Sequence, residues 1–174
     1  MCGIVGGVTN SNITPLLLEG LNRLEYRGYD SSGLIVLSNQ NTFNRARSVG
    51  KVINLEKNLT ERVTKIKGNI GIAHTRWATH GEPSTINAHP HISKNSVSVV
   101  HNGIIENYIE LKNNQLKQGY KFKSETDTEV IVHAIDFAMN SCSTLLKSVQ
   151  EAVKLLKGSY GLGIISSNFP DQII

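Results

Sequence analysis

The second residue of the chain, Cys2, would combine two reactive groups once the initiator methionine is removed. Trimming of Met1 before a small residue is common, and it would leave the Cys2 thiol beside a free α-amine. An α-amine has an unperturbed pKa of about 7.7–8.0, so it can act as a general base for the thiol near neutral pH. Cys2 is therefore a candidate nucleophile. Taken alone, it could equally be a small apolar residue entering a strand.

A dense polar run follows a predicted strand and contains Arg76, Trp77, Thr79 and His80. The guanidinium of Arg76 is a planar, permanently charged fork that suits a carboxylate, and Thr79 and His80 add short-range donors. Each of these residues alone is most often an ordinary surface group. Gathered beside a tryptophan at a strand end, they are more typical of a ligand site.

Two shorter motifs could complete such a site. Asn102 and Gly103 offer a side-chain amide next to an unobstructed backbone N–H, which is the composition of an oxyanion hole. Asn-Gly is also a common tight-turn dipeptide. Asp127 could pair with the ammonium group of a ligand, or it could cap the helix that follows it.

Composition excludes several other classes of function. Two cysteines and no leading apolar segment argue against a secreted disulfide scaffold and favour the cytoplasm. No apolar run approaches the roughly 20 residues of a membrane span. The net charge of +4 is weak support for nucleic-acid binding. The six histidines follow no metal-ligand spacing and no glycine-rich nucleotide loop is present, so we expect neither a metal nor a cofactor.

Hydrophobic patterning predicts a mixture of strands and helices that must position these groups. Strands are expected at 4–8, 33–38, 42–47, 69–74, 97–101 and 161–166. Helices are expected at 14–28, in pieces over 49–67, and at 107–119, 126–140 and 143–158, with caps at Thr14, Asn107 and Ser143. The polar segment 75–96 is long enough to be functional or disordered. The pattern is compatible with α/β or α+β, and spacing alone does not choose between a parallel and an antiparallel sheet.

Six motifs in a fixed order resemble one known family. They are CGIVG (2–6), LEYRGYDS (24–31), HTRWATHGEP (74–83), NAHPH (87–91), HNGIIEN (101–107) and SETDTE (124–129). Together they resemble the glutaminase domains of class II glutamine amidotransferases, in particular those of the glutamine–fructose-6-phosphate aminotransferases. The resemblance extends from residue 2 to about residue 166. Tyr29 and Trp77 favour this branch over the asparagine synthetases and the amidophosphoribosyltransferases, respectively.

The resemblance implies an α+β fold, a four-layer αββα N-terminal-nucleophile hydrolase sandwich of two antiparallel sheets. It also implies that residues 1–174 form one glutaminase domain that stops before its last strands, with the sugar-isomerase domains absent. By the same resemblance, Cys2 is the nucleophile and its α-amine the base, while Asn102 and Gly103 form the oxyanion hole.

The remaining implied roles concern substrate binding. Arg76, with Thr79 and His80, would hold the glutamine α-carboxylate, and Asp127 would hold the α-ammonium. Trp77 would lie in a loop that closes over glutamine, and Arg27 would have a supporting role near the nucleophile.

The implied reaction is hydrolysis of L-glutamine to glutamate and ammonia through a Cys2 γ-glutamyl thioester. In a full-length homodimeric enzyme, an isomerase domain would use the ammonia to convert fructose 6-phosphate to glucosamine 6-phosphate, for amino-sugar synthesis. No cofactor, nucleic acid or membrane partner is expected. The alternatives are the glutaminase domain of an amidophosphoribosyltransferase-like enzyme and a non-catalytic glutamine-binding module.

Overall fold

The structure is a computed structural model that describes residues 2–62, 65–78 and 81–174. The strands are β1 (Gly3–Val8), β2 (Ser31–Leu37), β3 (Phe43–Val49), β4 (Ile70–Arg76), β5 (His91–Ser93), β6 (Val97–Ile105) and β7 (Gly158–Ser166). The helices are α1 (Thr14–Leu24), α2 (Val52–Thr60), α3 (Tyr108–Lys117), α4 (Thr128–Ala138) and α5 (Leu145–Val153), and a 3-10 turn η1 (Glu25–Arg27) follows α1.

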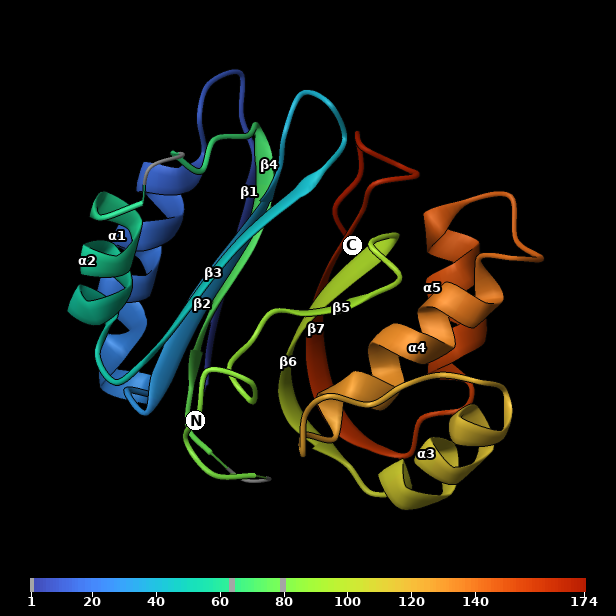
Figure 1. Cartoon of the computed structure of the whole chain (residues 1–174). Coiled ribbons are helices and arrows are strands. Elements are labelled where there is room, and N and C mark those ends of the chain that lie inside the picture. Colours follow the sequence, from blue (N-terminus) through green and yellow to red (C-terminus); the bar gives the residue numbers. More distant parts are fainter. Residues whose placement is uncertain (1, 63–64, 79–80) are drawn as a thin grey trace.

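The strands form two antiparallel sheets that face each other between helical layers (Figure 1). One sheet has the order β1-β4-β2-β3 and carries α1 and α2 on its outer face. The other has the order β5-β6-β7 and carries α4 and α5 on its outer face, with α3 packed beside α4. This is the α+β sandwich predicted from the sequence.

Three apolar layers hold the sandwich together. In β4, for example, Ile72 faces the opposite sheet whereas the next residue, Ala73, faces the helices, and both are fully buried. Because side chains alternate between the two faces of a strand, a strand buried on both faces must be apolar at successive positions. This requirement explains the continuous apolar runs 33–37 in β2 and 70–73 in β4.

The register of the first sheet brings the chain's start beside the end of β4. Gly3 pairs with Thr75, and Ser31 of β2 pairs with Arg76 on the other side of the same strand. Cys2, directly before β1, therefore lies next to the last residues of β4. Spacing in the sequence did not choose between a parallel and an antiparallel sheet. The observed strand pairing is antiparallel throughout, and it assembles the candidate site.

Several expected boundaries and caps were wrong. The segment 75–96 contains β5, which at three residues is too short to show a periodic pattern. Helix α5 is capped by Thr144, whose hydroxyl accepts from the Lys147 N–H at 3.2 Å, and not by Ser143. Asn107 stands at the start of α3 but its side chain bonds the backbone that follows α5. Thr14 lies inside the first turn of α1, after the capping residue.

The last residues of the chain pair with β7 of the second sheet. Ile173 forms a bridge with Ile165 of β7, and Ile174 exchanges two backbone hydrogen bonds with Ile164 at 2.7 and 3.1 Å. Across the described ranges, none of the helices has the length and apolar character needed to cross a membrane.

Candidate active site

A cavity of about 260 Å³ opens where the ends of β4 and β6 meet the start of α4. Its lining comes from five separate stretches of sequence: Cys2, Arg76, Trp77, His89, His101, Asn102, Gly103, Ile104, Thr126, Asp127 and Thr128. The cavity therefore gathers most of the chemically active residues singled out from the sequence.

Cys2 lies against the backbone that leaves β4. The Trp77 N–H donates to the Cys2 sulfur at 3.3 Å, and the thiol lies 3.7 Å from the Trp77 carbonyl oxygen. The Gly3 N–H donates to the Thr75 hydroxyl at 3.1 Å, which fixes the residue that follows the cysteine. Burial raises the pKa of the Cys2 thiol above its ordinary value, and the Trp77 N–H and the Arg76 charge oppose this only in part. The thiol is therefore mainly protonated near neutral pH.

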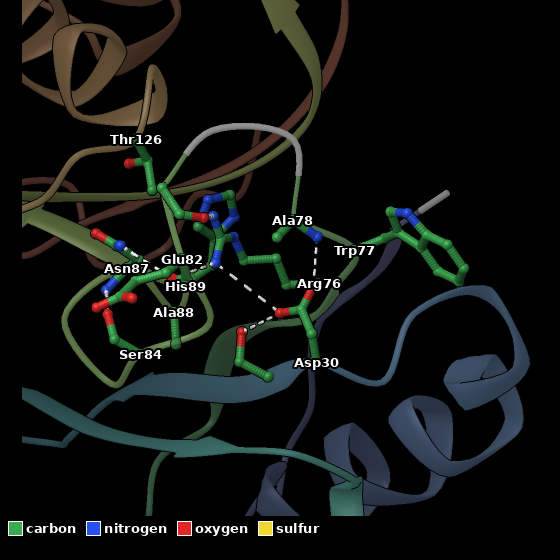
Figure 2. A network of polar contacts seen from close by, with 12 residues as sticks. Asp30, Arg76, Trp77, Ala78, Glu82, Ser84, Asn87, Ala88, His89 and Thr126 are labelled. Atoms are coloured by element: carbon green, nitrogen blue, oxygen red, sulfur yellow. Dashed lines mark hydrogen bonds and ion pairs between the residues drawn. The ribbon is translucent and has the colours of Figure 1, made fainter.

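Arg76 is buried, and its guanidinium is held from two sides, as Figure 2 shows. Its Nη2 donates to the Gly81 carbonyl at 3.0 Å and its Nη1 to the Glu82 carbonyl at 3.3 Å, while the Asp30 carboxylate lies 3.9 Å away. The same carboxylate accepts from the Ala78 N–H. A buried cation requires such oxygen partners, so this network aligns the loop after β4 with the cavity.

Asn102 and Gly103 lie near the end of β6, opposite Gly161 and Tyr160 of β7. Gly103 has a φ of 141°, and a Cβ atom there would stand 2.2 Å from the Ser159 carbonyl oxygen. Only glycine fits both this backbone conformation and this close approach. The position is in the strand and not in a tight turn, which was the alternative interpretation of the Asn-Gly pair.

Asp127 immediately precedes α4 but makes no side-chain cap to that helix. One oxygen of its buried carboxylate accepts from the Ile105 N–H at 2.8 Å, and the other lies 3.8 Å from His101 Nδ1. The carboxylate thus ties α4 to β6 at the wall of the cavity. The capping alternative is wrong, and a negative charge faces the same cavity as Arg76.

A hydrogen-bonded ring of polar side chains supports the floor of the cavity. The backbone N–H of His101 donates to His89 Nδ1 at 3.3 Å. Neutral His89 therefore carries its proton on Nε2, and this N–H donates to the Thr128 hydroxyl at 3.0 Å. The Thr128 hydroxyl also forms a hydrogen bond with His101 Nδ1 at 2.9 Å. His74 Nε2 also donates to the His101 carbonyl at 2.8 Å. These contacts set the orientation of the residue before Asn102.

Burial keeps the inner histidines neutral. It lowers the pKa of His74 to about 3 and the pKa values of His89 and His91 well below 6.5, and the neighbouring cationic groups lower them further. Within the described part of the chain, no three His, Cys, Asp or Glu side chains are grouped so that they could hold a metal ion. His74, His89 and His91 act as hydrogen-bonding groups of the interior.

The structure brings together six of the nine predicted site residues: Cys2, Arg76, Trp77, Asn102, Gly103 and Asp127. Arg27 does not line this cavity and instead lines an adjacent hollow of about 190 Å³, which it shares with Cys2 and Asn102. The Trp77 ring is half exposed and packs edge-on against Tyr29 at 5.6 Å, pointing away from the Arg76 network (Figure 2). Thr79 and His80 lie outside the described residues.

Sequence reasoning assigned no role to four polar residues that build this site. His89, His101 and Thr128 line the cavity, and Asp30 holds the loop that follows Arg76. All four lie inside the motifs quoted for the family resemblance. Their place inside these motifs was the available signal, but only the fold shows which of them meet.

The fold and the site define the class of protein. Residues 74–172, more than half of the chain, match the family described as "Glutamine amidotransferase domain". The chain belongs to this family.

Individual relatives agree with this assignment. The chain is 58% identical over 174 residues to the glutamine–fructose-6-phosphate aminotransferase [isomerizing] of Acinetobacter baylyi. The alignment covers all of this chain and 28% of that protein. A solved structure titled as the allosteric regulatory enzyme of purine biosynthesis superposes with a TM-score of 0.78 at 28% identity, covering 95% of this chain and 36% of that one. The glutamine phosphoribosylpyrophosphate amidotransferase of B. subtilis, complexed with ADP and GMP, superposes with a TM-score of 0.74 at 26% identity, covering 95% and 35%. The N-terminal-nucleophile sandwich is common to these structures.

The neutral histidines predict a loss of stability in acid. Because the unfolded chain protonates a histidine near pH 6.5 whereas folded His74 does so only near pH 3, the free energy of unfolding should fall as the pH drops between these values. Each such histidine contributes about 1.4 kcal/mol per pH unit. His74→Gln, which keeps a donor for the His101 carbonyl, should reduce that slope in urea titrations. Above pH 7 the free energy of unfolding should depend on pH equally in the wild type and in His74→Gln. Equal slopes below pH 6 as well would show that buried His74 is not held neutral.

The backbone of Gly103 gives a second prediction. Gly103→Ala should destabilise the fold by about 1–3 kcal/mol through backbone strain, with the contact to Ser159 adding to this. Gly161→Ala is the matched control, because its Cβ would meet no atom within 4 Å and Gly161 pairs with the neighbouring Asn102. It should change stability by less than about 0.5 kcal/mol. Urea unfolding measures the free energy of unfolding of both variants. Equal values for Gly103→Ala and Gly161→Ala would contradict the requirement for glycine at position 103.

Proposed function

We propose that this chain hydrolyses the side-chain amide of L-glutamine through a covalent thioester on Cys2. The observation that carries the proposal is one cavity, in a glutamine amidotransferase domain, lined by a thiol, a fixed guanidinium, a carboxylate and an Asn-Gly pair. Free glutamine carries an α-carboxylate, an α-ammonium and a side-chain amide. The cavity offers a group of suitable chemistry for each of them.

The first chemical step is attack of the Cys2 sulfur on the side-chain carbonyl carbon of glutamine. Negative charge then develops on the carbonyl oxygen, where the Asn102 amide and the Gly103 N–H would donate hydrogen bonds. Removing one such donor typically raises the barrier by about 3–4 kcal/mol. Residue 103 must be glycine because a side chain there would collide with β7, and its place with Cys2 and Asn102 in the lining of one cavity supports this role.

Proton transfer requires a base beside the thiol. Burial raises the pKa of the Cys2 thiol, so a base must remove its proton before attack. In a chain trimmed of Met1, the α-amine of Cys2 takes that proton and then gives it to the departing nitrogen, so that ammonia leaves and the γ-glutamyl thioester remains. Water, deprotonated by the same amine, then hydrolyses the thioester and releases glutamate and the free thiol.

The non-reacting end of glutamine would be held by charge. We assign the α-carboxylate to Arg76, assisted by Thr79 and His80, and the α-ammonium to Asp127. Anchoring both charged groups uses binding energy to orient the amide toward the sulfur. It also disfavours a glutamine within a peptide, which lacks both charges. Trp77 would close over the bound amino acid, and Arg27 would support the region beside the nucleophile.

The chain spans about 28% of the length of the curated relatives it matches. We propose that residues 1–174 are the glutaminase domain of a longer glutamine–fructose-6-phosphate aminotransferase, in which a separate isomerase part uses the ammonia to make glucosamine 6-phosphate. The identity of 58% to such an enzyme supports this over an amidophosphoribosyltransferase, whose B. subtilis structure is 26% identical. A cytoplasmic homodimer is part of the same proposal and rests on the family resemblance.

Labelling with an electrophilic glutamine analogue tests the proposed nucleophile. A diazoketone analogue should add once to the wild-type chain and once to Cys142→Ala, and should leave Cys2→Ala unlabelled. Cys142 is the matched control, because it is the second free cysteine and lies in the turn between α4 and α5. Intact mass spectrometry counts the adducts and also reports whether Met1 has been removed.

The same samples separate an enzyme from a glutamine-binding module. The wild-type chain and Cys142→Ala should release ammonia from glutamine, and Cys2→Ala should lose this activity by several orders of magnitude. A labelled Cys142, or full ammonia release by Cys2→Ala, would refute the mechanism. Glutamine binding without an adduct or ammonia release would favour the non-catalytic module.

The ammonium-binding role of Asp127 gives a separate prediction. Asp127→Asn retains an oxygen for the Ile105 N–H but removes the charge, so KM for glutamine should rise about tenfold or more, with a smaller change in kcat. Glu125→Gln is the matched control, because Glu125 is exposed, contacts Asn87 and does not line the cavity. Steady-state kinetics of both variants tests this. A lower kcat with an unchanged KM would show that Asp127 does not bind the ammonium.

A further inference from the structure

A second hollow, of about 270 Å³, lies beside the edge strand β3, next to β5 and the segment that precedes α4. Four cationic side chains line it, together with one histidine and one carboxylate: Arg45, Arg47, Lys94, Lys123, His91 and Glu129. We call it the basic hollow. It shares no lining residue with the Cys2 cavity.

The two arginines of the basic hollow are anchored but not neutralised. Arg45 and Arg47 are two positions apart in β3, so their side chains leave the same face of the strand. Arg45 Nη1 donates to the Pro90 carbonyl at 3.0 Å, and Arg47 Nη1 donates to the Ile86 and Ala88 carbonyls at 3.0 and 2.9 Å. These contacts hold both guanidinium groups at the hollow, and no acceptor in the described part of the chain is paired with Nε or Nη2 of either arginine.

No carboxylate among the residues described forms an ion pair with Arg45, Arg47 or Lys123. Glu129 lines the hollow and its single negative charge partly offsets those of Arg45 and Arg47, while its oxygens accept from the Lys123 and Ser124 N–H groups and from the Ser124 hydroxyl at 2.6–3.1 Å. Lys94 is paired with Asp136 at 3.0 Å. The hollow therefore keeps an excess of positive charge.

The charge excess is energetically unfavourable without a counter-ion. Burial and the adjacent charge of Arg45 lower the pKa of Arg47 to about 10, and burial also lowers the pKa of Arg45. Half-buried cations that are held close together, with free donors, are stabilised by an anion that accepts from several of them at once.

We propose that the basic hollow binds a phosphate group, either as the free ion or as part of a small phosphorylated molecule. A phosphate offers three acceptor oxygens and nearly two negative charges near neutral pH, which suits several cations converging from β3 and from the opposite wall better than a single carboxylate does. A volume of about 270 Å³ exceeds what a phosphate ion fills. Ile86 and Ile92 supply apolar wall and Asn95 an amide for an attached organic group. This binding does not depend on the proposed glutaminase activity.

Titration of the chain with sodium phosphate at constant ionic strength tests the proposal. We expect saturable binding by calorimetry, with a dissociation constant on the order of millimolar, and shifts of the Lys123–Glu129 amide signals in NMR spectra. Arg47→Gln and Lys123→Gln should each weaken binding about tenfold, and Arg47→Lys should restore part of it. Arg23→Gln is the matched control, because Arg23 is exposed on α1 and paired with Glu19, and it should bind like the wild type.

Two further probes identify the source of the phosphate. Tighter binding of glycerol 3-phosphate or AMP than of inorganic phosphate would identify an esterified phosphate as the ligand, and equal affinities would identify the free ion; either result supports a phosphate site. If circular dichroism shows that Arg47→Gln does not fold, the phosphate affinity of Lys123→Gln tests the proposal instead, because Lys123 is exposed. An absence of saturable phosphate binding, or affinities unchanged in both Arg47→Gln and Lys123→Gln, would overturn the proposal.

Discussion

The burial of one permanently charged group, the Arg76 guanidinium, organises the candidate site. A buried cation is costly unless oxygen atoms surround it, and here the oxygens come from Asp30, Gly81 and Glu82 on two separate loops. Both loops must therefore approach the end of β4. The same strand end supplies the Trp77 N–H that contacts Cys2. The position of the nucleophile and the shape of the cavity wall thus follow from how this charge is satisfied.

Buried polar side chains surround that charge, and His74, His89 and His91 among them are neutral. The inner histidines remain uncharged because burial disfavours their protonated forms, and they act as fixed donors and acceptors. The ring formed by His89, Thr128 and His101 joins β6 to the start of α4. It holds Asn102 and Asp127 on the same cavity wall, so the cavity is lined by the negative charge of Asp127 as well as by the positive charge of Arg76.

Most elements could be predicted from the chain's patterning, and the reasons for the exceptions are physical. The apolar runs of β2 and β4 are clear because both faces of these strands are buried. The short strand β5 carries no pattern, and it exists because β6 offers it a partner. Asn107 resembles a helix cap locally, yet its side chain is drawn to the backbone after α5 by a contact distant in sequence.

The sequence by itself determined the kinds of groups available: a thiol at residue 2, a guanidinium, a carboxylate and an Asn-Gly pair, in motifs typical of one family. Residue types and spacing carry this information because they decide which bonds a group can make. Only the tertiary structure decided that six of the nine expected residues share one cavity, that Arg27 lines the adjacent hollow, and that Asp127 binds β6 instead of capping α4. These outcomes depend on strand register and on which buried polar groups find partners, and both are properties of contacts between residues far apart in the chain.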